Sequence, residues 1–304
     1  MAQDSLEPTP EFLESVMDGR ALAEAGKFEA AEGHFRRLLE CARASHLGNH
    51  TRALGALIVL YGRAGRFFEV YVLAQSLAEL TKSAGEAGLP TRAFAQSSMC
   101  GALSQLRLSE PLGEALREFR ATLDAIGSAR VDLELKYLAA SGAHARTTGD
   151  TEQARLYLTA YRDLLTQYPE VEVVFRWASG MSEAELALAE GKPTRALEAI
   201  ERLESSDVTP QFHRLKELTF RASAYNALQD PAQASDVALE AMALLESVQH
   251  DPFLASDRVH HGARLAQEME ALVKLDEAQR IYDLTAAAIM VRMGQLYECI
   301  QQLT

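Results

Sequence analysis

Residues 26–35, with the sequence GKFEAAEGHF, contain the pattern from which the fold is inferred. Gly26 is followed five residues later by the small residue Ala31, and four residues further on by the larger apolar residue Phe35. Two antiparallel helices joined by a short turn cross closely only where a small side chain faces the partner helix. Glycine in the turn supplies the backbone freedom that ends the first helix. The stretch therefore predicts a helical hairpin that turns at Gly26.

The same pattern returns along almost the whole chain. Gly65, Gly149 and Gly191 begin further clear copies, and three weaker copies complete the series. The small residues of the seven copies are Ala31, Val70, Ala115, Ala154, Ala196, Ala234 and Ala278. A single hairpin cannot bury its apolar face, so neighbouring hairpins must stack. We therefore predict an all-α fold, an α-α superhelix of about seven hairpins with about 40 residues each.

The remaining sequence has the texture of such a repeat. Apolar residues recur at helical spacing, short turns with Gly, Pro or Asp separate the helical stretches, and no alternating segment indicates a strand. We predict three regions: a flexible lead at 1–10, the repeat array at 11–281, and a C-terminal helix at 282–304.

The repeats resemble the tetratricopeptide-repeat (TPR) family over roughly residues 11–290. The residues that carry the resemblance are, in the first repeat, Gly19, Leu22, Gly26, Phe28, Ala31 and Phe35, and in the fourth repeat, Gly142, Gly149, Ala154 and Leu158. The repeats are longer than the family's usual 34 residues, and only Tyr61 and Tyr225 supply its tyrosine late in the first helix. Longer repeats of this type are common in bacterial regulators. The resemblance implies protein or peptide binding on a concave face lined by the first helix of each hairpin.

The composition narrows the choice of partners and of compartment. Acidic residues number 43 against 30 basic ones, a formal charge of −13, which argues against nucleic acid or an anionic membrane as the main partner. Cys41, Cys100 and Cys299 are far apart and form no CxxC pair, which is typical of a reducing compartment. The N-terminus lacks the features of a secretion signal, and no apolar run is long enough to span a bilayer. We expect a soluble cytoplasmic protein.

No catalytic or metal-binding motif emerges from the sequence. His46 and His50 have the spacing of a helical metal pair, but Gly48 and Asn49 lie between them in an expected loop. The remaining adjacent histidine pair, at 260–261, would point in different directions on a helix. We expect a protein that is not an enzyme and has no catalytic residue, metal or cofactor, and we expect Cys100 to face the concave surface as a plain small residue.

Basic residues dominate the positions that a TPR-like stack would turn toward its concave face. These ligand-groove candidates are Arg20, Arg52, Arg63, Arg107, Lys136, Arg146, Lys216 and Arg264. Only three acidic residues, Glu24, Glu185 and Glu270, share these positions. Such a lining suits an acidic peptide, a carboxylate terminus, or a phosphorylated or nucleotide ligand. The alternative is that uneven repeats shift the register, or that these cations pair with neighbouring glutamates.

The C-terminal helix carries a heptad seam. Its members are Tyr282, Ala286, Ile289, Met293, Leu296, Ile300 and Leu303. The seam either packs on the last repeat as a cap or begins a coiled coil that makes a homodimer, with Ile289, Met293, Leu296, Ile300 and Leu303 as the dimerisation candidates.

These observations favour a non-catalytic sensor or regulatory domain that binds a protein or peptide. The terminal helix suggests the N-terminal part of a bacterial signalling protein, by analogy of architecture alone. One alternative is a stand-alone TPR scaffold or adaptor in a protein complex. Another is a peptide-pheromone receptor, for which residues 1–11 are too short to hold the helical segment expected ahead of the array.

Overall fold

A computed structural model describes residues 6–42, 46–127, 130–171, 173–203, 211–247, 255–272 and 274–303. These residues form helices and turns and include no strand, so the predicted all-α fold of helical hairpins is confirmed. The chain divides into two compact units, 1–140 and 141–304, with the division inside helix α7. Each unit is described by itself.

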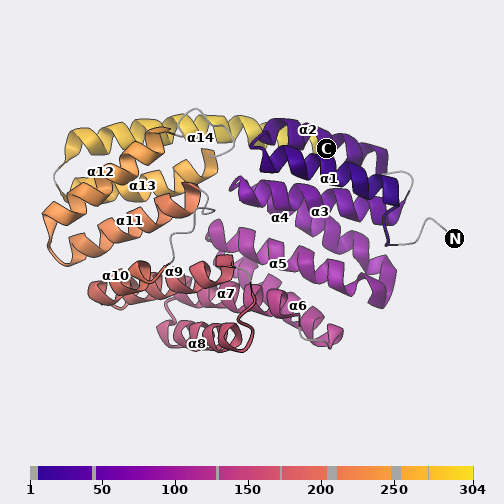
Figure 1. Ribbon diagram of the computed structural model, residues 1–304, viewed down its shortest axis with the longest axis horizontal. Coiled ribbons are helices and arrows are strands. Elements are labelled where there is room, and N and C mark those ends of the chain that lie inside the picture. The colour runs from indigo at the N-terminus through magenta and orange to yellow at the C-terminus, as the bar shows by residue number, and fades with distance from the viewer. Residues whose placement is uncertain are drawn as a thin grey trace. The chain divides into compact units, whose positions relative to one another are not determined.

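The first unit consists of consecutive packed helices (Figure 1). They are α1 (Pro10–Glu24), α2 (Phe28–Ala42), α3 (Leu47–Arg63), α4 (Phe67–Leu80), η1 (Thr81–Gly88), α5 (Leu89–Gln105), α6 (Ser109–Ile126) and the first part of α7 (Val131–Thr147). Each of α1 to α5 packs against the next α-helix, and the first helices of successive hairpins, α1, α3 and α5, also pack together. The core between them is built from alanine, leucine and phenylalanine side chains.

The second unit repeats this arrangement. After the end of α7 it contains α8 (Thr151–Gln167), α9 (Val173–Ala189), α10 (Pro193–Glu201), α11 (Gln211–Ala227), α12 (Pro231–Ser247), α13 (Ala255–Ala271) and α14 (Leu275–Leu303). The first helices α9, α11 and α13 pack side by side, and each also contacts the second helix of its own hairpin. Helix α14 is continuous, so the boundary predicted between 281 and 282 falls inside one helix.

The turns inside the hairpins share one backbone geometry. The residue two positions before the second helix has a positive φ, between 56° and 82°, in six hairpins of the described chain. These turn residues are Gly26, Gly65, Arg107, Gly149, Gly191 and Gln229. In the third hairpin the Arg107 amide donates to the carbonyl of Ser104 and the Leu108 amide donates to the carbonyl of Leu103. This pairing is a Schellman motif, which ends the first helix and favours glycine.

The turn residues correct the predicted register of the third repeat. Counting five residues on from Arg107 places Leu112, not Ala115, at the position occupied by Ala31 in the first hairpin. Leu112 is 1% exposed and fills the crossing of α5 and α6. The arginine in the turn hid this register, because the sequence pattern was anchored on glycine. Arg107 is therefore a turn residue rather than part of a concave lining.

We expect Arg107→Gly to stabilise the protein by about 1 kcal/mol, because a non-glycine residue with positive φ is strained. Arg117→Gly, at an exposed position inside α6, is the matched control and should lower stability by about 1 kcal/mol. Urea unfolding of both variants tests the pair, and equal losses of stability would contradict the strain at Arg107.

One position on the first helices is buried in all six of these hairpins and is Gly, Ala or Cys in five of them. Seven residues before each turn residue stand, in order, Gly19, Ile58, Cys100, Gly142, Ala184 and Ala222, all buried. Cys100 is fully buried at this position, and burial, with a smaller contribution from the charge of Glu118, raises the pKa of its thiol to about 12. The expectation that Cys100 faces the concave surface is therefore wrong, because this position of α5 turns it into the core.

Candidate ligand-binding face

Four consecutive hairpins of the second unit contribute one charged side chain each to a common cluster. Glu185 of α9 accepts from Arg146 Nη2 of α7 at 2.8 Å and from Lys216 Nζ of α11 at 2.7 Å. Arg264 of α13 adds a third positive charge that acts on the same carboxylate. All four residues were predicted at concave positions, and in the structure they lie close together.

The cluster fixes the charge of Glu185. Burial opposes ionisation of the carboxyl, but the positive charges of Lys216 and Arg146 outweigh it and hold the pKa of Glu185 at about 2. The side chains of these three residues are 17% to 21% exposed, so the pairs are mostly shielded from water. Glu185 thus holds Arg146 and Lys216 in fixed positions, while a part of each cation stays accessible to a ligand.

An aromatic pair lies beside these charges. The Trp177 indole of α9 stacks on the His213 ring of α11, with centroids 3.9 Å apart and planes 14° apart. Trp177 Nε1 donates to Glu217 Oε1 at 2.7 Å, and Lys216 Nζ lies 5.6 Å from the indole centroid. A flat aromatic surface next to a cation is suited to contact an apolar side chain and an acidic group of one peptide. Sequence reasoning missed Trp177 and His213.

The pKa of His213 gives a pH dependence that can be measured. Burial and then the charge of Lys216 lower the pKa from 6.5 to about 4 in the folded chain. Between pH 6.5 and 4 the unfolded chain binds more protons at this site, so stability falls as the pH falls through this window. We expect wild type to lose about 2 kcal/mol more than His213→Gln between pH 7 and 4, after allowance for partial exposure. Urea unfolding at both pH values measures this, and parallel losses would contradict the shift.

Arg264 is positioned by an aromatic ring and a polar network. Its guanidinium carbon lies 4.1 Å from the Phe220 ring centroid, and Nε donates to Ser223 Oγ at 3.2 Å. Ser223 donates in turn to Glu268, which also accepts from Asn226 Nδ2 at 2.6 Å. Glu217 therefore contacts Trp177, and Glu268 is linked to Arg264 through Ser223.

The other predicted groove residues belong to the first unit. Arg20, Arg52 and Arg63 are exposed on α1 and α3 of the first unit. Burial and the charge of Arg20 lower the pKa of Arg52, so these two arginines lie within each other's field. Lys136 lies over the Phe94 ring at 5.8 Å. Among the predicted acidic residues, Glu24 is exposed and Glu270 contacts Tyr282 of α14.

The first unit contains a second charge network, in which positive and negative side chains are equal in number. Arg66, 4% exposed, donates to Glu69 at 2.8 Å and to Glu32 at 3.0 Å. Glu32 also accepts from Tyr61 Oη at 2.8 Å and pairs with Arg36 at 2.6 Å. Two cations meet two carboxylates, so this network joins α2, α3 and α4 without surplus charge. It is best explained as structural.

No helix in the described part of the chain is long and apolar enough to cross a membrane. The described residues also hold no group of three or more His, Cys, Asp or Glu side chains with the arrangement of a metal site. His46, considered above as a metal ligand, caps α3 by accepting from the Asn49 amide at 3.4 Å.

The fold and this face define a class of protein: an all-α stack of helical hairpins with a charged and aromatic face on its first helices. Comparison of the chain with models of known protein families gave no match, and comparison with curated proteins gave no significant match. The resemblance to TPR proteins therefore stays a prediction.

Proposed function

We propose that this protein is a non-catalytic binding module that takes an acidic peptide segment on the first helices of the second unit. The observation that carries the proposal is the pairing of Arg146 and Lys216 with the single carboxylate of Glu185, with the charge of Arg264 near enough to act on the same carboxylate. Acidic groups of a peptide would pair with the accessible parts of these cations, and the Trp177–His213 pair would accept an adjacent apolar side chain.

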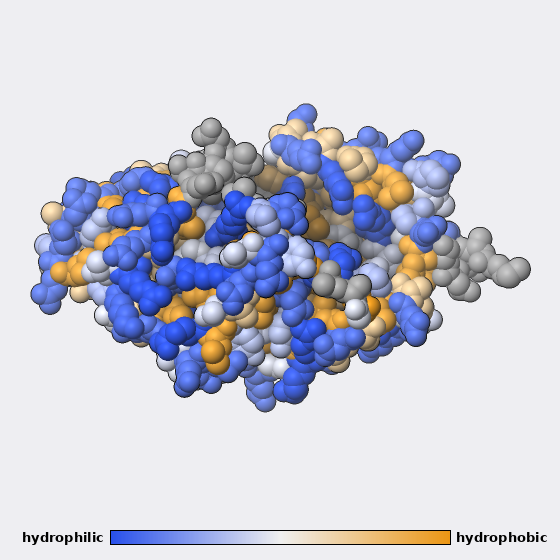
Figure 2. Space-filling view, turned by 60° about the horizontal axis from the view of Figure 1, so that its bottom comes forward, coloured by the Kyte–Doolittle hydropathy of each residue, from blue (hydrophilic) through white to orange (hydrophobic). Residues whose placement is uncertain are grey.

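The molecular surface seen in one view is largely polar. Figure 2 shows hydrophilic residues over most of the face in view, with hydrophobic residues in separate patches between them. The proposed peptide face itself combines charged groups with one aromatic pair, so recognition there would depend on charge and a small aromatic surface. A regulatory or sensor role follows naturally, since binding a peptide across four hairpins would change how they pack.

Intrinsic fluorescence tests this proposal directly, because Trp177 is the only tryptophan in the chain. A peptide rich in Asp, Glu and Leu should change the emission of Trp177 on titration, and the same peptide with Asn and Gln should not. Lys216→Met and Arg264→Gln should each weaken binding about tenfold. Arg63→Gln, on an exposed arginine of the first unit, is the control and should bind as wild type does. Equal affinities for all variants would reject the proposed face.

A second candidate function is homodimerisation through α14. The residues that pack this helix on its own unit are Ala278, Ile281, Thr285 and Ala288, all 5% exposed or less. The heptad members Ala286 and Ile289 are exposed, as are the neighbouring Met290 and Val291. Ala286 and Ile289 therefore do not pack on the last repeat, as a simple capping helix would require. The side chains of Met293, Leu296, Ile300 and Leu303 lie outside the described residues, although the helix itself extends to Leu303.

Light scattering tests the dimer. We expect wild type to be dimeric and Ile289→Glu to be monomeric, because a buried charge would disrupt a heptad seam. Val59→Glu, at a similarly exposed apolar position on α3, is the control and should leave the molar mass unchanged. A monomeric wild type would favour the stand-alone adaptor instead.

A further inference from the structure

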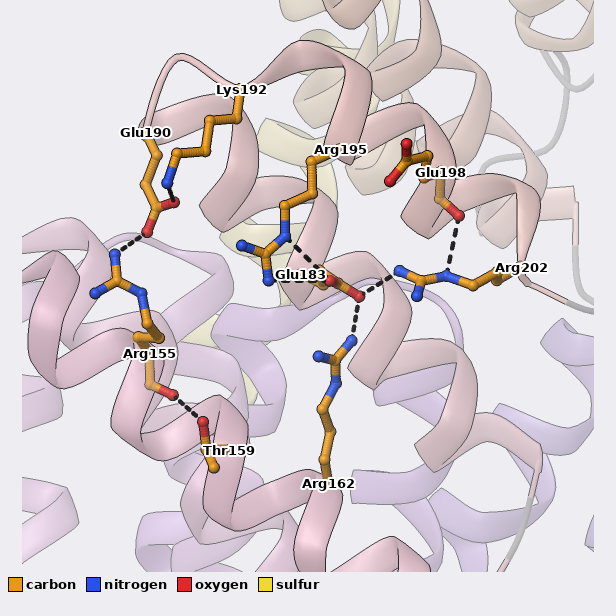
Figure 3. Close-up of polar contacts among 9 residues, drawn as sticks. All are labelled: Arg155, Thr159, Arg162, Glu183, Glu190, Lys192, Arg195, Glu198 and Arg202. Atoms are coloured by element: carbon orange, nitrogen blue, oxygen red, sulfur yellow. Dashed lines mark hydrogen bonds and ion pairs between the residues drawn. The ribbon is translucent and has the colours of Figure 1, made fainter.

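On the side of α9 opposite Glu185, three arginines surround the buried carboxylate of Glu183. Glu183 is two residues before Glu185, so the two side chains leave the helix in roughly opposite directions. Figure 3 shows Glu183 surrounded by Arg162 of α8 and by Arg195 and Arg202 of the α10 segment. Arg162 and Arg202 donate to Glu183 Oε2, the latter at 2.7 Å, and Arg195 Nη2 donates to Oε1 at 3.3 Å.

The exposure of the four side chains is unequal. Glu183 is 6% exposed, whereas the three arginines are 40% to 62% exposed. The carboxylate is therefore the buried anchor, and the guanidinium groups are held around it at the surface. Exposed arginines otherwise spread apart, since like charges repel and long side chains gain entropy in water. Glu183 removes that freedom and fixes three cations in one place.

The cluster around Glu183 carries more positive charge than its one carboxylate neutralises. Three guanidinium groups face one carboxylate, which leaves two positive charges, in a chain whose formal charge is −13. The neighbouring pairs do not offset this surplus. Glu190 is occupied by Arg155 and Lys192, and Glu198 contributes its backbone carbonyl, not its carboxylate, to Arg202 Nε.

Donor groups also remain available. A guanidinium has five N–H donors. In the described part of the chain, the Nη1 groups of Arg162, Arg195 and Arg202 donate to no protein acceptor. Three forked donors at the surface, already ordered by Glu183, match a ligand with several acceptor oxygens on one atom. Guanidinium groups bind phosphate in this bidentate manner.

We propose that Arg162, Arg195 and Arg202, held in place by Glu183, form a binding site for a phosphate monoester group. A phosphate monoester carries about −1.5 to −2 charges at pH 7 and three acceptor oxygens, which matches the two surplus charges. A carboxylate brings one negative charge and two oxygens, so it would leave the site half neutralised. The site is separate from the acidic-peptide face, which lies on the other side of α9 and involves none of these arginines.

Calorimetric titration of the full chain tests the site with three probes at constant ionic strength: inorganic phosphate, a phosphoserine peptide and the same peptide with glutamate. We expect phosphate-bearing probes to bind at least tenfold more tightly than the glutamate peptide. Stronger binding of the phosphopeptide than of inorganic phosphate would identify a phosphorylated protein as the source of the group. Equal binding of the two would identify free phosphate, and either result supports the site.

Variants locate the binding. Arg195→Gln and Arg202→Gln should each weaken phosphate binding at least fivefold, and Arg195→Lys should also weaken it because the fork is lost while the charge remains. Arg155→Gln is the matched control on the same surface and should bind within twofold of wild type. Lys216→Met should also leave phosphate binding unchanged, which separates this site from the peptide face. Thermal melting confirms that each variant folds. Equal losses in Arg155→Gln and Arg195→Gln, or no preference for phosphate over glutamate, would overturn the proposal.

Discussion

Glu185→Gln is expected to lower the free energy of unfolding by about 3 kcal/mol, because it leaves Arg146 and Lys216 without their shared counter-charge in a shielded site. Glutamine keeps the size and one acceptor oxygen, so the loss reports charge and not packing. The turn after α9 provides the control. Glu190 pairs with Arg155 and Lys192, which are 52% and 53% exposed and already hydrated, so Glu190→Gln should cost less than about 1 kcal/mol.

The pH dependence gives a second measurement on the same pair of variants. The folded pKa of Glu185 is about 2 against 4.5 in the unfolded chain, so its contribution is fully present above pH 4.5. That contribution is lost as the pH falls toward 2. The difference in stability between wild type and Glu185→Gln should therefore shrink over this range. A constant difference, or equal costs for Glu185→Gln and Glu190→Gln, would show that Glu185 does not hold the cations.

Gly19→Ala is expected to destabilise the first hairpin by about 2 kcal/mol, because the closest approach of α1 and α2 has no room for a methyl group. A Cβ atom at Gly19 would lie 2.7 Å from Phe35 Cζ and 2.9 Å from His34 Cδ2. Phe35 is 2% exposed and fixed in the core, so the ring cannot swing away. Gly33→Ala is the control on the facing helix. Its Cβ would meet only Arg37 Nη1 at 3.7 Å, so this variant should be stabilising by about 0.5 kcal/mol.

A double variant tests whether the clash with Phe35 is the cause. Phe35→Leu alone should destabilise, since it leaves a cavity, but combined with Gly19→Ala it makes space for the new methyl group. The combined cost should be smaller than the sum of the single costs by at least about 1 kcal/mol. Additive costs in urea unfolding would place the strain elsewhere.

The hairpin turns could be predicted from sequence because their cause is local. In six hairpins of the described chain a residue with positive φ follows the end of the first helix, and glycine meets that need at Gly26, Gly65, Gly149 and Gly191. The register of the third repeat was predicted wrongly because Arg107, and not glycine, occupies the position with positive φ.

The residues of the candidate sites could be predicted only in part from local sequence patterns. Helical spacing and the assumption of stacked hairpins correctly grouped Arg146, Glu185, Lys216 and Arg264 on one face. The same reasoning also named Arg20, Arg52 and Arg63 of the first unit, whose role as groove residues stays a prediction.

The sequence by itself determined the all-α fold and most of the hairpin turns in the described chain, since these depend on apolar period, small residues and backbone freedom within a few residues of each other. Only the tertiary structure decided which cations share a carboxylate. The three arginines around Glu183 are 12 to 21 residues away from it in the chain, and Arg146 is 39 residues from Glu185. Contacts of this kind depend on how neighbouring helices pack and on the reach of long side chains, and no local pattern in the sequence encodes either.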